Sequence, residues 1–247
     1  MLSYIILGIL QGLTEFFPVS SSGHLVIAQG LLGLKSEGIV LPIILHLGTL
    51  VAVIIFFFKD IISLFRNLKT ILFLFTATVI TASIALLGKD FFEKLFSSPR
   101  AVCLALFLTG IGLIFTRYFP FGTRRDVGVK DGIALGFMQA FAIIPGISRS
   151  GATISTLLFR GIQKEDSFKF SFIASIPLIL GALILEFKKI DLAIQQNSIN
   201  LLLGFIASLI SGLLALLLLR LVIRRAKLYY FGYYSIFIAL LAFIKIG

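Results

Sequence analysis

The sequence contains little charge. Asp, Glu, Lys and Arg make up 13% of its 247 residues, whereas 59% are hydrophobic. The mean hydropathy is +1.10, and apolar runs long enough to cross a bilayer recur along the chain. A soluble domain of this size would carry more charge. The shortage of charge therefore excludes a soluble protein and predicts an all-α integral membrane protein.

Several motifs are also absent. The sequence has no Gly-Lys-Ser/Thr phosphate-binding loop, no zinc-type spacing of His and Cys, and no Gly-x-Ser-x-Gly elbow. Nucleotide-binding, zinc-hydrolase and serine-hydrolase functions therefore lack support. The single cysteine, Cys103, cannot form a disulfide within the chain. We see no sign of a soluble domain, a long linker or a cleavable signal, and we expect residues 1–247 to form one membrane domain.

Six apolar runs have the composition of transmembrane helices, and the second of them is at the short end for a span. The expected spans are 39–58, 71–88, 101–119, 168–187, 199–223 and 229–246.

Two further apolar segments, 5–33 and 132–158, are interrupted near their middle by Pro, Gly and Ser. Broken backbone at membrane depth must be buried in protein or line a wet cavity. We therefore expect each segment to form a re-entrant hairpin of two half-helices. An ordinary span with a kink is the alternative.

These two interrupted segments are imperfect copies of each other, 128 residues apart. The matched positions are Gly8 with Gly136, Gln11 with Gln139, and Ser20, Ser22 and Gly23 with Ser148, Ser150 and Gly151. Because three spans follow each copy, the second unit must be inverted relative to the first. The sequence thus predicts an inverted-topology repeat, with units at about 1–120 and about 130–247 and a shared site near the midplane.

The basic residues are distributed unevenly in this topology. Fourteen Lys and Arg fall on one side, in 59–70, 117–130, 160–169 and 220–227, and seven fall on the other side. This bias predicts that the first group is cytoplasmic and that both termini are extracytoplasmic. Topology and anionic membrane lipids explain the net charge of +11, so we expect no nucleic-acid partner.

The first half-helix has a polar face. Gly8, Gln11, Gly12 and Glu15 are spaced i, i+3, i+4 and i+7, which places them on one side of a helix. A carboxylate inside a membrane domain is costly unless it is solvated, paired or bound to a cation. We therefore predict a functional Glu15, with Gln11 beside it as a second metal ligand. The alternative is a salt bridge from Glu15 to Arg149 that only joins the two repeats.

In both motifs, serines precede an apolar run, as they do at helix N-termini. Two such N-termini aimed inward form a site for an anion such as phosphate, and Arg149 adds a planar fork that matches phosphate oxygens. Helix capping by the serines and a structural ion pair of the arginine are the simpler alternatives. The expected phosphate-binding residues are Ser20, Ser22, Gly23, Ser148, Arg149, Ser150 and Gly151.

The chain has two histidines. His24 lies beside the serines of the first motif, where it could act as an acid or base, as a nucleophile toward phosphorus, or as a metal ligand. His46 lies inside an expected span, where a hydrogen bond between helices is the simpler interpretation.

At these residues the sequence resembles the undecaprenyl-diphosphatase family, the bacterial membrane phosphatases also called bacitracin-resistance proteins. The resemblance covers the whole length. It rests on Gln11-Gly-Leu-Thr-Glu15 followed by Pro18 to His24, and on Pro145-Gly-Ile-Ser-Arg-Ser-Gly151.

By position, the resemblance implies functional roles for Gln11, Glu15, His24 and Arg149, with Ser21 as the serine linked to catalysis. Gln11 occupies a place where many members have Glu, so one formal charge is missing from any metal site. Our reasoning from the residues leaves the nucleophile open between Ser21, His24 and water.

The resemblance implies hydrolysis of undecaprenyl diphosphate to the monophosphate with Mg²⁺ or Ca²⁺, in the inner (cytoplasmic) membrane of a bacterium. It also implies recycling of the lipid carrier for peptidoglycan synthesis, cell-wall biogenesis and cell shape, and resistance to bacitracin. We expect a polyprenyl diphosphate and membrane lipids as partners, and leave a homodimer open.

A polyprenyl-phosphate transporter or flippase is the rival prediction, because inverted repeats with broken helices are typical of transporters. A carrier has little need of a carboxylate, an imidazole and a hydroxyl in one motif. A purely structural membrane protein would leave the buried charges without a purpose.

Overall fold

The computed structural model describes residues 1–31, 40–64, 66–96, 98–118, 122–185 and 187–246. Within these ranges the chain is helical and has no strand; an isolated bridge joins Arg124 to Ile162. The all-α prediction is therefore confirmed. The helices are α1 (Leu2–Phe16), α2 (Ser21–Leu31), α3 (Val40–Phe56), α4 (Phe58–Leu64), α5 (Leu68–Leu87), α6 (Lys89–Phe96), α7 (Pro99–Phe115), the 3-10 turn η2 (Thr116–Tyr118), α8 (Val129–Phe141), α9 (Arg149–Phe159), α10 (Lys164–Ile173), α11 (Ile176–Leu185), α12 (Phe187–Arg224) and α13 (Tyr229–Ile246).

Four helical stretches of the described chain are long and apolar enough to cross a membrane. They are Leu68–Leu87, Arg100–Tyr118, Lys164–Leu185 and Ser198–Arg224, and each corresponds to an expected span. The run expected at 39–58 bends by 74° where α3 meets α4, and α13 is short for a span. The protein is thus a multi-pass membrane protein, while the count of six spans stays a prediction.

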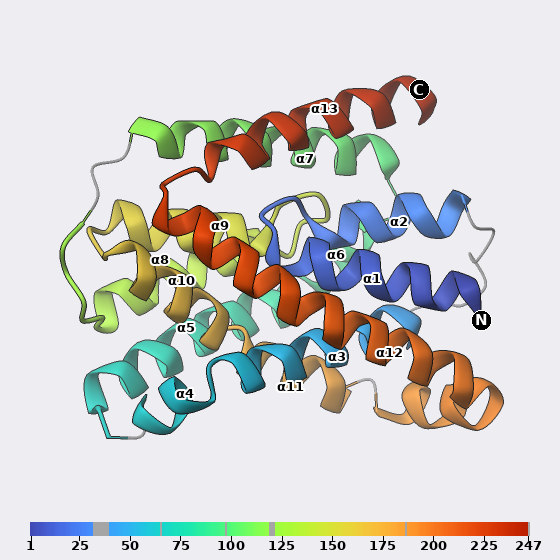
Figure 1. The fold of residues 1–247 in the computed structure, drawn as a ribbon, viewed down its shortest axis with the longest axis horizontal. Coiled ribbons are helices and arrows are strands. Elements are labelled where there is room, and N and C mark those ends of the chain that lie inside the picture. The colour runs from blue at the N-terminus through green and yellow to red at the C-terminus, as the bar shows by residue number, and fades with distance from the viewer. Residues whose placement is uncertain (32–39, 65, 97, 119–121, 186, 247) are drawn as a thin grey trace.

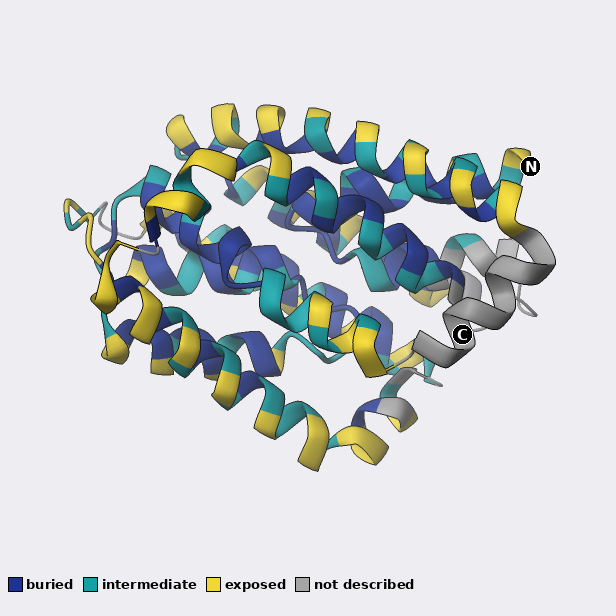
Figure 2. Ribbon diagram, turned by 90° about the horizontal axis from the view of Figure 1, so that it is seen from below, coloured by how far each residue is buried: buried dark blue, intermediate teal, exposed yellow. Residues whose placement is uncertain are grey.

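The surface of the helices fits this environment. Figure 2 shows that buried residues face the middle of the molecule and that exposed residues face outward. Large apolar side chains such as Phe75, Leu87 and Leu214 are among the exposed ones. Such a surface suits lipid, because a helix in a bilayer gains nothing by hiding its apolar side chains.

Both interrupted segments form helical hairpins. The first consists of α1 and α2, and the second of α8 and α9. Figure 1 shows that they enter the molecule from opposite ends and that their tips meet near its middle. A hydrogen bond from Ser150 Oγ to the Phe17 carbonyl oxygen joins the tips at 3.4 Å.

Small residues allow helices of the two halves to approach closely. A methyl group added at Gly8 on α1 would collide with the Gly204 carbonyl of α12. The second hairpin packs in the same way on the first half: a methyl group at Gly132 of α8 would lie 2.6 Å from the Phe73 carbonyl of α5. Each hairpin therefore packs against a long helix of the other half.

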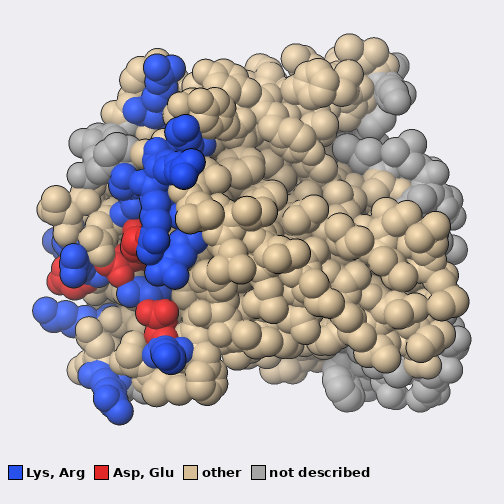
Figure 3. All heavy atoms as spheres, in the orientation of Figure 1, with Lys and Arg blue, Asp and Glu red and all other residues tan. Residues whose placement is uncertain are grey.

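The basic residues gather at one end of the molecule. Figure 3 shows Lys and Arg in a band at that end, whereas the rest of the visible described surface carries no charge. The connections from α4 to α5, from η2 to α8, from α9 to α10 and from α12 to α13 all lie there, and both termini lie at the opposite end (Figure 1). The predicted gathering of these four connections is confirmed.

A buried carboxylate fixes the second hairpin at this basic end. Asp131 accepts two hydrogen bonds from Arg124, at 2.7 and 2.8 Å, and one from Arg160 Nε at 2.9 Å. Burial alone would raise the pKa of Asp131, but these hydrogen bonds outweigh it and hold the pKa below its usual value. One side chain thus joins the start of α8 to the end of α9.

The contact between α7 and α13 gives a test of the packing. A methyl group at Gly110 would lie 2.7 Å from the Gly232 carbonyl, whereas a methyl group at Gly112 on the same helix would meet nothing within 4 Å. We expect Gly110→Ala to destabilise the protein by about 1–3 kcal/mol because the helices must separate. Gly112→Ala should leave it unchanged or slightly more stable. Thermal unfolding in detergent measures both, and equal behaviour of the two variants would contradict the packing.

Candidate functional site

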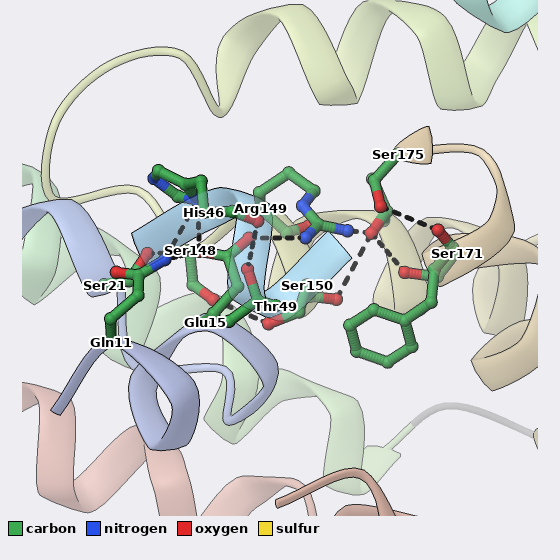
Figure 4. Close-up of polar contacts among 12 residues, drawn as sticks. Gln11, Glu15, Ser21, His46, Thr49, Ser148, Arg149, Ser150, Ser171 and Ser175 are labelled. Atoms are coloured by element: carbon green, nitrogen blue, oxygen red, sulfur yellow. Dashed lines mark hydrogen bonds and ion pairs between the residues drawn. The ribbon is translucent and has the colours of Figure 1, made fainter. Parts of the chain in front are cut away.

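The two hairpin tips surround one carboxylate, that of Glu15 in the last turn of α1 (Figure 4). Arg149 Nη2 donates to Glu15 Oε1 at 2.7 Å, and Ser21 Oγ donates to Glu15 Oε2 at 2.6 Å. Glu15 is only 8% exposed. The site therefore consists of a buried carboxylate held on one side by a hydroxyl and on the other by a guanidinium.

The residues that hold Glu15 occupy equivalent positions in the two copies. Ser21 is the first residue of α2, and Arg149, 128 positions later, is the first residue of α9. Side chains at the start of a helix point away from its body, so both reach the point where the tips meet. The motif copies have diverged so that one supplies a hydroxyl and the other a cation.

Gln11 extends the site by one helical turn. Its Nε2 donates to Glu15 Oε2 at 3.1 Å and lies 2.9 Å from Nδ1 of His46 on α3. His46 Nδ1 is also 3.4 Å from Glu15 Oε2. The side-chain amide oxygen of Gln11, Oε1, is buried and has no hydrogen-bond partner in the described part of the chain. The site thus holds one acceptor that is ready for a donor or a cation.

The second copy has a related contact at the same spacing, made to a backbone oxygen and not to a side chain. Gln139 Nε2 donates at 3.3 Å to the carbonyl oxygen of Ala174, 35 residues later. Gln11 and His46 are also separated by 35 residues. In both units, a glutamine of the first half-helix therefore reaches the same position of the following helix. Only the first unit places an imidazole there.

Arg149 retains capacity for another ligand. Its Nη2 is bonded to Glu15, whereas its Nη1 is buried and has no partner among the described residues. The guanidinium carbon lies 5.4 Å from the centre of the Phe172 ring, which supports the side chain from one face. A guanidinium with a free buried nitrogen is suited to an anionic oxygen.

The serines of the two motifs form matching pairs. Ser20 Oγ lies 3.3 Å from Ser22 Oγ, and Ser148 Oγ lies 3.2 Å from Ser150 Oγ. Ser148 also caps α9, because its Oγ accepts from the Gly151 backbone N–H at 3.1 Å. The capping expected as the simpler alternative is therefore present at Ser148, and the predicted role of the serines and of Gly23 and Gly151 in phosphate binding stays a prediction.

His24 lies in the same hairpin but makes different contacts. Its Nδ1 is 2.9 Å from the Ser20 carbonyl oxygen, and its Nε2 is 3.0 Å from the hydroxyl of Tyr234 on α13. The described contacts of His24 include none with Glu15 or Arg149. The structure thus brings Glu15, Ser21 and Arg149 together directly, while His24 faces a tyrosine.

Two residues of this region were not singled out from the sequence. His46 makes the expected hydrogen bond between helices, to Gln11, but its place 3.4 Å from Glu15 was not predicted. Tyr234 was not considered at all. The signal for His46 is a polar residue within an apolar run, whereas no local signal indicates Tyr234, which meets His24 across 210 residues.

A cavity of about 660 Å³ lies between α7, α8 and α9. Most of its lining is apolar, and it follows α9 from Ser148 at the start of the helix to Arg160 beyond its end. Apolar walls that begin beside the hairpin tips suit the chain of a lipid whose headgroup is polar.

The apolar helices and the buried polar site define an integral membrane protein with a charged site where two helical hairpins meet. Residues 4–241 match the family described as bacitracin resistance protein BacA, and the chain belongs to this family.

Relatives named undecaprenyl-diphosphatase resemble the chain over almost its whole length. The protein from Thermotoga petrophila is 40% identical over 242 residues, which cover 97% of this chain and 98% of the relative. The protein from Carboxydothermus hydrogenoformans is 40% identical, over 93% of this chain and 91% of its own. Undecaprenyl-diphosphatase 1 from Shouchella clausii is 34% identical, over 99% of this chain and 96% of its own.

Proposed function

We propose that this protein hydrolyses undecaprenyl diphosphate to undecaprenyl phosphate and inorganic phosphate, and thereby recycles the lipid carrier of cell-wall synthesis. The observation that carries the proposal is the meeting of Glu15, Ser21 and Arg149 at the hairpin tips. The names of the relatives favour this hydrolase over a carrier that only moves polyprenyl phosphates. Nη1 of Arg149, which is buried and has no partner among the residues that the structure describes, supports binding of a phosphate oxygen.

The short hydrogen bond from Ser21 to Glu15 supports Ser21 as the nucleophile. Ser21 Oγ forms a bond to the terminal phosphorus while its proton passes to Glu15 Oε2. The bond between that phosphorus and the bridging oxygen breaks, and undecaprenyl phosphate leaves. Arg149 stabilises the charge on the transferring group, as a preorganised donor does.

A water molecule then cleaves the phosphoserine. Its oxygen attacks phosphorus, one of its protons passes to His24, and Ser21 recovers its own proton from Glu15 as inorganic phosphate is released. His24 finally loses the proton to solvent. In this scheme Glu15 takes the proton of Ser21 in the first half and returns it in the second, while His24 takes the proton of the attacking water.

We also propose that a divalent cation, Mg²⁺ or Ca²⁺, takes part. The side-chain oxygen of Gln11 has no partner among the described residues. It lies on the same helix face as the carboxylate of Glu15, and both groups are hard oxygen ligands. Among the described residues, no three or more His, Cys, Asp or Glu are grouped so that they could hold a metal ion. Phosphate oxygens and water would therefore complete the coordination shell of the cation. When bound, the ion would neutralise phosphate charge.

The packing supports a finer topology. The two hairpins are re-entrant, the two halves form an inverted repeat, and the basic end faces the cytoplasm of a bacterial inner membrane, with both termini outside. The opposite entry of the hairpins and the gathering of basic residues at one end support this arrangement (Figures 1 and 3). A homodimer stays a prediction.

Phosphate release from undecaprenyl diphosphate by the purified protein tests the function and the cation together. We expect release from the wild type, its loss after exhaustive chelation, and its recovery with Mg²⁺ or Ca²⁺. Gln11→Glu should preserve or raise the activity because it restores a charged ligand. Full activity in chelator would remove the cation from the proposal, and failure of the wild type under all conditions would remove the hydrolase.

The shape of Arg149 gives a second test. Arg149→Lys keeps the charge but loses the second nitrogen that we assign to phosphate, so kcat should fall by about 10²-fold. Arg125→Lys, the same change at an exposed arginine of the basic end, should leave kcat unchanged. Equal kcat values for Arg149→Lys and the wild type would show that a point charge suffices there.

The orientation can be checked by labelling single cysteines in a Cys103-free protein. Cysteines at the exposed positions Asn67 and Thr123 should resist a membrane-impermeant thiol reagent in intact cells. A cysteine at exposed Ser198, at the start of the span that ends at the basic end, should react. Labelling of Asn67 together with protection of Ser198 would reverse the orientation.

A further inference from the structure

The pair formed by His24 and Tyr234 carries a further inference, which rests on the proposed function. His24 is 8% exposed, and its ring lies parallel to that of Tyr234, with an angle of 7° between the planes and 5.7 Å between the centres. The Tyr234 hydroxyl is 3.0 Å from Nε2. Tyr234 lies on α13, so a helix of the second half closes over the histidine of the first.

The other ring nitrogen fixes which tautomer is present. Nδ1 lies 2.9 Å from the carbonyl oxygen of Ser20, which can only accept a hydrogen bond. Nδ1 must therefore carry a proton. In the neutral imidazole, Nε2 then has the lone pair and accepts from the Tyr234 hydroxyl. The nitrogen that can take up a proton is the one that the tyrosine covers.

We propose that Tyr234 is the proton relay of His24. As the attacking water loses a proton to the Tyr234 oxygen, the phenol passes its own proton to Nε2. The outcome is an imidazolium whose Nε2–H donates to the same oxygen, and a phenol whose new O–H points away from the ring. The pair gains the one proton that the water loses, and the reverse sequence, which releases that proton to solvent, resets the pair.

A hydroxyl is the group that such a relay requires. It donates to neutral His24 and accepts from protonated His24, so a buried ring nitrogen keeps its partner in both states. A buried polar group that loses its partner is destabilising, and a charged one is more so. Phenylalanine would leave Nε2 without a partner in both states, although its ring could still stack on the imidazole.

The test compares two tyrosine-to-phenylalanine changes on one helix. Tyr234→Phe should lower kcat for phosphate release by about 10²-fold, at the lower end of what acid–base catalysis contributes, with little change in KM. Tyr233→Phe alters a neighbour whose ring packs on Tyr229 and not on His24, and it should leave kcat unchanged. A wild-type kcat for Tyr234→Phe would overturn the relay while leaving the hydrolase intact.

A double-mutant cycle separates a relay from a structural role. Because Tyr234 acts through His24, Tyr234→Phe should cause no further loss of kcat in a His24→Ala background. An undiminished loss in that background would overturn the proposal. His24→Ala with the activity of the wild type would overturn it as well, and phosphate release by the wild type would still support the hydrolase.

A spectroscopic measurement tests the tautomer in the wild-type protein and does not depend on activity. The chain has two histidines, so a protein with ¹⁵N-labelled imidazoles gives four ring-nitrogen signals. We expect one histidine with a protonated Nδ1 and a hydrogen-bonded, unprotonated Nε2, and we expect Tyr234→Phe to shift that Nε2 signal. If both neutral histidines carry the proton on Nε2, the relay is wrong.

Discussion

The ion pair between Glu15 and Arg149 is the interaction on which the rest of the structure depends. A charged group in an apolar interior is stable only when its hydrogen-bonding capacity is met. Glu15 meets that condition with partners from both halves of the chain, because Ser21 belongs to its own hairpin and Arg149 to the other. Removing either hairpin would leave a buried charge unpaired. The halves are therefore tied together by the same contact that assembles the site.

The close packing of helices keeps this contact in place. Gly8 and Gly132 let each hairpin approach a long helix of the other half, so the tips are positioned by partners distant in sequence. Asp131 adds a fixed point at the basic end, where it joins α8 to α9. The functional side chains thus lie at helix ends whose bodies are packed against other helices.

The sequence predicted the broken segments and their matching positions, because a proline stands near serines in each. It also predicted the candidates Glu15, Ser21 and Arg149, because two of them are charges in an apolar run and the third belongs to the serine motif. It could not predict that α3 bends away into α4, since that run is as apolar as a straight span. It gave Tyr234 no weight, because an aromatic residue in an apolar helix has no distinguishing neighbours. The partner of His24 follows only from the packing of α13 on α7, which is a tertiary property.

The crossed packing of the two halves has a consequence for synthesis. Protein chains emerge from the N-terminus, so Glu15 and the glycine face of α1 enter the membrane well before Arg149, and before α12, which fills the groove beside α1. The first hairpin cannot reach its final packing until almost the whole chain has been inserted. Assembly of this protein is therefore completed late, and a chain that stops before Arg149 leaves the Glu15 carboxylate in the membrane without its cationic partner.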